Sequence, residues 1–269
     1  MTGKDSCKIC ESTLQFIFQA NVLSKYPVSY WQCTQCGFVQ TDEPFWLDEA
    51  YGSAISSADV GLVSRNMGNA DLLECIINNG FDPAKKFIDY AGGYGMLVRM
   101  MRDKGYDFYR QDKYCRNLFA ETFDIKDIEQ TTAQPFELLT AFEVFEHLVD
   151  PWEEIGKMFF YSKNILFSTA LLPDQKITRP DDWWYFIPET GQHIAFYTEA
   201  SLHIIAKRFN TTYHKINGNL HLFTQNKINR NLLQSFMISL AWRTIYKKVF
   251  LKKRTSLLGP DHEKMLRKM

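Results

Sequence analysis

The chain has 269 residues, of which 45% are apolar and 15% aromatic, so it can bury the core of one large domain with a small appendage, and this composition excludes a largely disordered chain. The 31 basic and 31 acidic residues cancel, which excludes a strongly basic protein, and we expect no DNA partner. The charge is unevenly spread, because residues 226–269 hold 11 Lys or Arg but only 2 Asp or Glu, so a basic tail follows an acidic body.

Targeting signals are missing from the sequence pattern. The N-terminus shows no charged segment followed by an apolar run, and no uninterrupted apolar stretch reaches about 18 residues. We therefore expect no signal peptide and no membrane span. The expected location is cytoplasmic, with peripheral membrane contact through the basic tail as an option.

Four of the six cysteines lie in two Cys-x-x-Cys pairs separated by 22 residues: Cys7, Cys10, Cys33 and Cys36. Two such turns can place four thiolates at the corners of a tetrahedron, which suits zinc. Short strands are expected over 14–18 and 28–32, so residues 1–50 are predicted to form a zinc ribbon with a structural zinc. Reduced cysteines at chance spacing, or a redox Cys-x-x-Cys, are the alternatives.

A strand, a glycine-rich turn and a helix follow one another in the middle of the chain. After an expected helix over 64–78, residues 85–90 form the strand, 91–95 the turn, and the helix begins at Met96. This arrangement brings backbone close to a ligand at a helix N-terminus. A second strand over 106–111 ends at Asp112, whose carboxylate suits the two hydroxyls of a ribose.

The run Asp89-x-Ala91-Gly92-Gly93-Tyr94-Gly95 resembles the first motif of class I S-adenosylmethionine-dependent methyltransferases. That family usually has Gly where this chain has Ala91. An alanine is tolerated there if its φ is negative.

Further elements extend the resemblance to residues 85–225. Strands are expected over 136–142 and 163–169, with a helix over 152–160 between them. Strands over 211–216 and 219–225 flank Asn217-Gly218, which predicts a hairpin with a type I′ turn. A terminal antiparallel hairpin after five parallel strands is typical of the methyltransferase sheet, whereas a dinucleotide dehydrogenase would end differently.

The predicted fold is therefore α/β, a Rossmann-like seven-stranded methyltransferase sheet with a terminal antiparallel hairpin, plus the zinc ribbon. Its expected domains are the ribbon over 1–50, the S-adenosylmethionine-binding domain over 51–225, and a basic helical tail over 226–269.

The resemblance implies S-adenosylmethionine as cofactor and assigns its contacts. Asp112 would bind the ribose, and Asp89 would fix the loop through backbone hydrogen bonds. Asp124 or Glu121 would touch the adenine. The remaining contacts, near the methionine and the sulfonium, would be Ala91, Gly92, Gly93, Tyr94, Gly95, Phe142 and Glu143.

Four side chains are the candidate catalytic residues: Glu143, Glu146, His147 and His193. A hydroxyl acceptor must lose a proton, and a neutral histidine is a natural base near pH 7. The Glu-x-x-Glu-His run with a later histidine also resembles the metal site of small-RNA 3′-terminal 2′-O-methyltransferases, where all four would hold a divalent cation. Otherwise the glutamates only orient their neighbours and His147 is satisfied by backbone.

An aromatic and acidic stretch over 181–185 suits sugar rings, or packs as a lid over the cofactor. A helix over 229–251 precedes most of the basic residues of the tail. This helix packs on the body or at a dimer interface, visits an anionic membrane or a lipid-linked glycan, or contacts RNA. The oligomeric state stays open.

A four-cysteine module ahead of such a core is similar to bacterial sugar methyltransferases, and the aromatic stretch to those of surface-polysaccharide pathways. We therefore expect O-methylation of a sugar or glycan hydroxyl, in a surface-polysaccharide or nucleotide-sugar pathway, with C-methylation second. The alternatives are a metal-dependent RNA 2′-O-methyltransferase, a non-catalytic scaffold that docks partners through the ribbon, and a nicotinamide-dependent enzyme.

Overall fold

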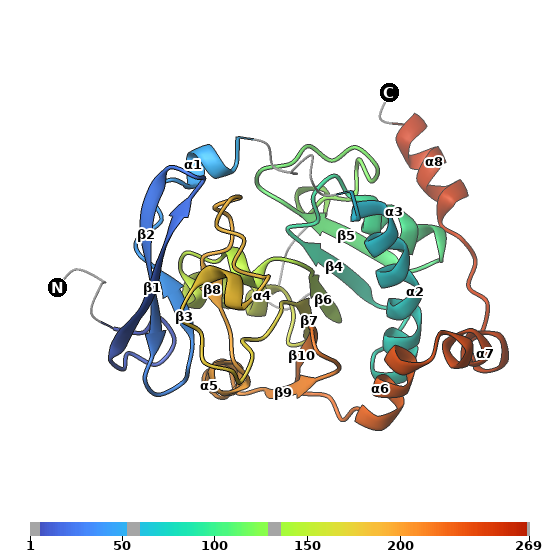
Figure 1. Ribbon diagram of the computed structural model, residues 1–269. Helices are drawn as coiled ribbons and strands as arrows, with labels where there is room; N and C mark the ends of the chain where they lie inside the picture. The colour runs from blue at the N-terminus through green and yellow to red at the C-terminus, as the bar shows by residue number, and fades with distance from the viewer. Residues whose placement is uncertain (1–5, 53–59, 129–135, 268–269) are drawn as a thin grey trace.

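The computed structural model describes residues 6–52, 60–128 and 136–267 (Figure 1). Two sheets organise this part of the chain: an N-terminal antiparallel sheet and a central, mostly parallel one. No helix in the described ranges is long and apolar enough to cross a bilayer.

The central sheet has six strands in the described residues, in the spatial order β5-β4-β6-β7-β10-β9. They are β4 (Lys86–Tyr90), β5 (Asp107–Gln111), β6 (Leu138–Ala141), β7 (Ile165–Ser168), β9 (Thr212–Lys215) and β10 (Leu220–Thr224). The first four run parallel, and β10 is antiparallel to both β7 and β9. Every residue of β6 and β10 is buried, as expected for strands with both faces covered.

Helices cover both faces of this sheet. The helix α3 (Met96–Asp103) joins β4 to β5, and α4 (Pro151–Tyr161) joins β6 to β7 in the opposite direction along the sheet. Because parallel crossovers are right-handed, the two helices lie on opposite faces. The long helix α2 (Leu62–Gly80) packs against α3 on its face (Figure 1).

Two sequence predictions about the sheet need correction. The seventh strand is reduced, within the described residues, to one parallel bridge between Arg110 and Asp124, because residues 112–123 fold as turns beside β5. The terminal hairpin is confirmed, but its type I′ turn is wrong, because neither Asn217 nor Gly218 has a positive φ. Instead, the Asn217 side chain accepts hydrogen bonds from the N–H groups of Asn219 and Leu220.

The N-terminal sheet has the order β1-β2-β3-β8. The first three strands are β1 (Leu14–Val22), β2 (Tyr26–Cys33) and β3 (Val39–Thr41), while β8 (Ala195–Phe196) comes from far along the chain. The short helix α1 (Leu47–Ala50) follows, and the Trp46 indole N–H donates to the Gly191 carbonyl at 2.8 Å. The sheet thus continues across the expected domain boundary at residue 50.

The C-terminal region forms three helices: α6 (Arg230–Ile238), α7 (Leu240–Phe250) and α8 (Leu258–Leu266). The single helix expected over 229–251 is wrong, because Ser239 leaves the helical conformation with φ −130° and ψ 108°. Its hydroxyl then caps α7 by accepting from the Trp242 N–H. Upstream, α5 (Glu199–Arg208) is capped by Thr198, as its sequence predicts.

A buried ion pair anchors α8 to the body. The Arg102 guanidinium donates to both oxygens of Asp261 at 2.8 Å, and both side chains are only 6% exposed. Breaking this pair leaves the buried guanidinium with Asp107 as its one recorded carboxylate partner among the described residues and with two of its donors unsatisfied.

We predict that Asp261→Ala lowers the free energy of unfolding by about 3 kcal/mol, because it leaves the Arg102 guanidinium buried beside a cavity. The matched control is Asp103→Ala, since Asp103 makes a more exposed pair with Arg99 and should cost less than about 1 kcal/mol. Urea unfolding of both variants measures the difference. Equal losses would contradict the assignment of Asp261 as the anchor.

Candidate active site

The glycine-rich turn leaves β4 with a strained backbone. Ala91 has φ +54°, so the condition under which alanine would replace glycine without strain is not met. Gly93 and Gly95 also have positive φ, at +54° and +84°. A Cβ added to Gly95 would lie 2.5 Å from the Asn117 amide oxygen, and one added to Gly92 would lie 2.7 Å from Asp89 Oδ2. The turn therefore has no room for side chains at Gly92 and Gly95, and its backbone stays accessible at the N-terminus of α3.

Asp112 lies where β5 ends and holds two loops together. Its Oδ2 accepts from the Gly93 N–H at 3.0 Å, and its Oδ1 accepts from the N–H groups of Tyr114 and Cys115, both at 2.7 Å. A carboxylate has about four acceptor positions, so Oδ2 keeps capacity for a ligand hydroxyl. The position fits the expected ribose contact.

Asp89 is fully buried at the inner side of the turn. The Thr140 hydroxyl donates to its Oδ1 at 2.6 Å, so its recorded partner is a side chain of β6 and not the loop backbone expected from the sequence. Burial raises the pKa of Asp89 to about 7, and the nearby charge of Asp112 adds to this effect. Asp89 therefore couples two neighbouring strands beneath the turn.

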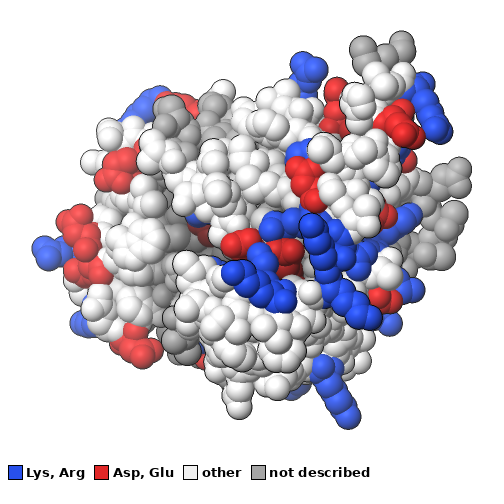
Figure 2. All heavy atoms as spheres, turned by 90° about the vertical axis from the view of Figure 1, so that its right-hand side faces the viewer, with Lys and Arg blue, Asp and Glu red and all other residues white. Residues whose placement is uncertain are grey.

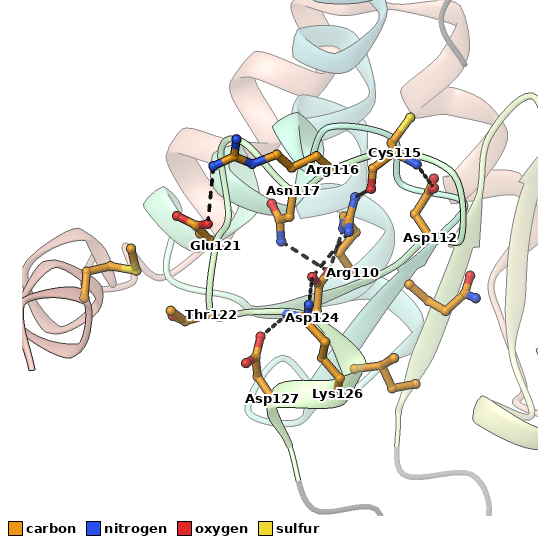
Figure 3. A pocket seen from close by; sticks show the side chains of 13 residues that line it. Arg110, Asp112, Cys115, Arg116, Asn117, Glu121, Thr122, Asp124, Lys126 and Asp127 are labelled. Atoms are coloured by element: carbon orange, nitrogen blue, oxygen red, sulfur yellow. Dashed lines mark hydrogen bonds and ion pairs between the residues drawn. The ribbon is translucent and has the colours of Figure 1, made fainter. Parts of the chain in front are cut away.

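A cavity of about 840 Å³ lies beside Asp112 (Figure 3). Of the two adenine candidates, Asp124 is committed to the Arg110 guanidinium at 2.6 Å, and it also accepts from Asn117. Glu121 is more open, with Arg116 3.9 Å away. An S-adenosylmethionine molecule fits these features. The turn offers backbone without side chains in the way, Asp112 offers a carboxylate for the ribose, and the cavity beside Asp112 offers space.

Arg110 is a functional residue that the sequence reasoning missed. It stands in the buried strand β5 and donates to the carbonyl oxygens of Gly93 and Cys115 as well as to Asp124. A charged residue inside an otherwise buried strand was the available signal, because such a charge needs partners.

Glu143 follows β6 and is clamped by the end of β7. It has φ +54°, its N–H donates to the Ser168 hydroxyl at 2.8 Å, and that hydroxyl donates to its Oε1 at 2.5 Å. Phe142 beside it is half-buried against the core. Both residues lie at the carboxyl edge of the sheet, where the sequence placed them.

Both candidate histidines are held in one orientation by backbone. His147 Nδ1 lies 2.9 Å from the Gln192 carbonyl oxygen, and His193 Nδ1 lies 2.7 Å from the Tyr185 carbonyl oxygen. A carbonyl can only accept, so each Nδ1 carries the hydrogen and each neutral ring has an unprotonated Nε2. The two rings are 5.0 Å apart, and burial lowers the pKa of both.

Glu146 lies next to these rings and is completely buried. Neither carboxylate oxygen has a hydrogen-bond partner within the described part of the chain. Burial, followed by the charge of Glu143, raises the pKa of Glu146 to about 7. A buried, unpartnered carboxylate calls for a functional explanation.

Within the part of the chain that the structure describes, two groups of side chains could hold a metal. Ligand atoms of Glu146, His147 and His193 all lie within 4.8 Å of one another, whereas Glu143 is turned to Ser168 and is not part of that group. The second group is the four predicted thiols, Cys7, Cys10, Cys33 and Cys36, again within 4.8 Å.

The aromatic stretch is largely packed. Trp183 and Tyr185 are buried, while Trp184 is 68% exposed. The Tyr185 ring lies 4.5 Å from the His193 ring, and the Tyr51 ring lies 6.1 Å from the His147 ring. These two tyrosines are wall residues of the candidate site. Tyr185 belongs to the stretch that the sequence assigned to a sugar or a lid, whereas the sequence did not assign Tyr51 to the site.

Comparison with known proteins agrees with this geometry. A family model described as a methyltransferase domain matches residues 68–216, which is more than half of the chain. No protein of curated function matches.

Several solved structures are similar. A 1,6-didemethyltoxoflavin N1-methyltransferase from Burkholderia thailandensis shares 11% identity, with a TM-score of 0.47 over 73% of this chain and 97% of that one. An O-methyltransferase family protein from the same organism shares 12% identity, with a TM-score of 0.44 over 68% of this chain and 63% of that one. Human N-acetylserotonin methyltransferase shares 13% identity, with a TM-score of 0.39 over 60% of this chain and 52% of that one. This chain thus spans less than two thirds of the latter two.

We predict that Ala91→Gly raises the free energy of unfolding by about 0.5–1 kcal/mol. Glycine removes the strain energy of a positive φ in the folded state, and this gain exceeds the free energy that the greater backbone entropy of glycine gives to the unfolded chain. The control is Ala241→Gly in the exposed face of α7, which should lower it by about 0.5–1 kcal/mol. Thermal unfolding compares them. A loss in both variants would show that Ala91 is unstrained.

Proposed function

The chain belongs to the methyltransferase domain family and is an S-adenosylmethionine-dependent methyltransferase, and on that premise we propose that it methylates a hydroxyl of a sugar or glycan. The observation that carries the proposal is the pair of neutral histidines, each with a free Nε2, at the carboxyl edge of the sheet. When bound, the cofactor supplies a methyl group that is already activated on a sulfonium, so the protein must mainly align the acceptor and remove its proton.

The histidines provide the base. A hydroxyl proton can pass to Nε2 of His147 or of His193, because each Nδ1 is engaged with a carbonyl and the low pKa of each ring keeps it neutral near pH 7. Glu146 Oε1 lies 3.8 Å from His147 Nε2, so its carboxylate would offset the positive charge that the ring gains.

The acceptor class is proposed from the aromatic stretch next to the site. The Trp184 ring is exposed and its centroid lies 5.1 Å from that of Tyr185, the neighbour of His193. Asp181, three residues earlier in the chain, is also exposed, and the two side-chain types suit the C–H face and the hydroxyls of a sugar. A glycan of a surface-polysaccharide or nucleotide-sugar pathway is our first choice of acceptor, and C-methylation of a sugar is the second.

We also propose that the four N-terminal thiols hold a structural zinc. The Sγ atoms of Cys7 and Cys36 are 3.6 Å apart, and those of Cys10 and Cys33 are 3.3 Å apart. A tetrahedral zinc with Zn–S bonds of about 2.3 Å would separate its sulfurs by about 3.8 Å. Backbone N–H groups of residues 9, 35 and 36 point at these sulfurs, which suits thiolates.

A second candidate function is a metal-dependent RNA 2′-O-methyltransferase. The observation in its favour is the buried carboxylate of Glu146, whose two oxygens have no hydrogen-bond partner within the described residues. One of its oxygens lies within 4.8 Å of a ring nitrogen of each of His147 and His193. A divalent cation there would satisfy all three groups. Against it, residues 1–225 are acidic overall.

The deciding experiment transfers labelled methyl from S-adenosylmethionine, in parallel, to a cell-envelope glycan extract and to size-selected RNA. We predict label in the glycan and continued activity after mild chelation that leaves one zinc per chain by elemental analysis. Label in the RNA, lost on chelation and restored by Mg²⁺ or Mn²⁺, would replace the first proposal with the second. Absence of zinc in the purified chain would contradict the structural zinc.

We predict that His193→Ala retains cofactor binding but loses turnover by about 10²-fold or more, because it removes one candidate base without touching the turn.

Asp112→Ala should instead abolish cofactor binding, because it removes the ribose-type carboxylate and frees the Gly93 N–H. His262→Ala, on the exposed face of α8, is the control. Calorimetric titration with S-adenosylmethionine and single-turnover rates separate the two effects, and unchanged turnover in His193→Ala would remove this residue from the mechanism.

A further inference from the structure

The helix α7 has an inner face fixed to the body and an outer face that no element of the described residues covers. On the inner face the Tyr246 ring packs 4.6 Å from that of Phe236, and the Lys247 ammonium lies 2.9 Å from Asp71 and 2.5 Å from Glu74 on α2. These contacts fix the rotation of the helix about its axis. Its opposite side therefore points away from the core.

That outer face carries an apolar stripe. Trp242, Ile245 and Val249 follow one another at intervals of three and four residues, which places them on one side of a helix. Their exposed fractions are 36%, 51% and 66%. Trp242 forms the edge of this stripe next to α6, because its indole N–H donates to the Ser235 hydroxyl at 3.1 Å. Leu240 and Phe250, at the two ends of α7, are also exposed, at 64% and 61%. Single exposed apolar residues are ordinary, but a continuous stripe marks an interaction surface.

Lysines border the stripe. Lys248, Lys252 and Lys253 are exposed, and within the described residues no carboxylate is recorded as their partner. Residues 226–260 contain eight Lys or Arg and no Asp or Glu. Figure 2 looks at the side of the molecule that holds α6, α7 and α8, and it shows basic side chains gathered beside a broad uncharged area.

We propose that the outer face of α7 and the lysines beside it form a docking surface for an anionic lipid bilayer. A helix of this kind lies in the interface, with its apolar side chains at the level of the headgroups and its lysines against lipid phosphates. The charge complementarity selects the occupant. The carboxylates recorded against α7, Asp71 and Glu74, are already paired with Lys104 and Lys247, so Lys248, Lys252 and Lys253 leave an excess of positive charge beside the apolar stripe. Such a surface matches one that is apolar within and negative at its rim. This surface is distinct from the catalytic edge of the sheet, so the inference does not depend on the acceptor proposed above.

A second copy of the chain fits the same surface less well. Two-fold pairing through α7 would bring the three lysines of each copy toward those of the other, and residues 226–260 contain no acidic residue to pair with them, while Asp71 and Glu74 are already paired with Lys104 and Lys247. RNA would match the lysines but would leave the apolar stripe exposed to water. The bilayer is the occupant that uses both features.

Sedimentation with vesicles tests the proposal on the full chain. The vesicles are phosphatidylcholine alone, and phosphatidylcholine mixed with phosphatidylglycerol in equal parts. We expect the chain to bind the mixed vesicles and not the neutral ones, and the binding to weaken as salt is raised. Equal binding to both vesicles, or binding to neither, would overturn the proposal.

Two sets of substitutions locate the surface. Ile245→Gln with Val249→Gln removes apolar area, and Lys248→Glu with Lys252→Glu and Lys253→Glu reverses the border charge. Each set should weaken binding by about tenfold or more, because both terms contribute to interfacial affinity. All five side chains are exposed, and circular dichroism confirms that each variant is folded.

The matched control changes the net charge by the same amount elsewhere: Lys163→Glu, Lys176→Glu and Lys207→Glu, all exposed and outside the tail. We expect the control set to bind within about twofold of the natural chain. If the control set lost as much vesicle binding as the Lys248→Glu, Lys252→Glu and Lys253→Glu set, net charge alone would explain the effect, and the assignment of the surface to α7 would be overturned. A dimer, measured by light scattering, that the Ile245→Gln and Val249→Gln pair dissociates would assign this surface to a second copy instead.

Discussion

The backbone of Ile194 connects the two halves of the molecule and positions its candidate catalytic groups. Its N–H donates to the Glu146 carbonyl at 2.9 Å, and its own carbonyl accepts from the Thr41 N–H at 3.2 Å. One residue thus joins the N-terminal sheet to the turn that follows β6. His193 precedes it directly, and His147 lies on the turn, so this pair of hydrogen bonds brings the two rings within reach of each other.

This connection gives the cysteine module a role beyond its own stability. The second Cys-x-x-Cys turn leads into β3, β3 pairs with β8, and β8 continues the segment that carries His193. The Thr198 hydroxyl also donates to the Cys36 carbonyl at 2.5 Å, which ties the beginning of α5 to the same turn. If a zinc fixes the four thiols, it therefore fixes one wall of the candidate active site as well. The module is better understood as part of the catalytic framework than as an appendage.

Local patterns in the sequence predicted most of the central sheet, because the signals lie within single segments. The strand, turn and helix around Gly93 and the capped α5 needed only neighbouring residues. The failures involve contacts between distant segments: no local pattern reveals that residues 195–196 pair with β3, or that residues 112–123 fold as turns and leave a single bridge at Asp124. Ser239 shows a subtler limit, since an apolar pattern continues through it while its hydroxyl favours a new helix start.

The same limit applies to the candidate site. The identities of His147 and His193 could be chosen from residue chemistry, but their tautomers depend on carbonyl groups supplied by Gln192 and Tyr185, which only the fold brings there. The complete burial of Glu146 is likewise a tertiary property. What the sequence could indicate was the residue type that a proton transfer needs, and not the environment that tunes it.

Three unfavourable features lie along one edge of the sheet. Ala91 after β4 and Glu143 after β6 both have φ +54°, and the buried Glu146 carboxylate, on the turn that follows, has no hydrogen-bond partner within the described residues. Each feature costs on the order of 1–3 kcal/mol and persists only where surrounding contacts determine it. Those contacts are present: Asp112 holds the first turn, Ser168 clamps Glu143, and the Ile194 backbone holds the turn that carries Glu146. Folding alone gives no reason to place three such costs on adjacent strands, whereas binding a cationic cofactor and moving a proton at that edge does, because both are stabilised by a carboxylate that water does not already satisfy.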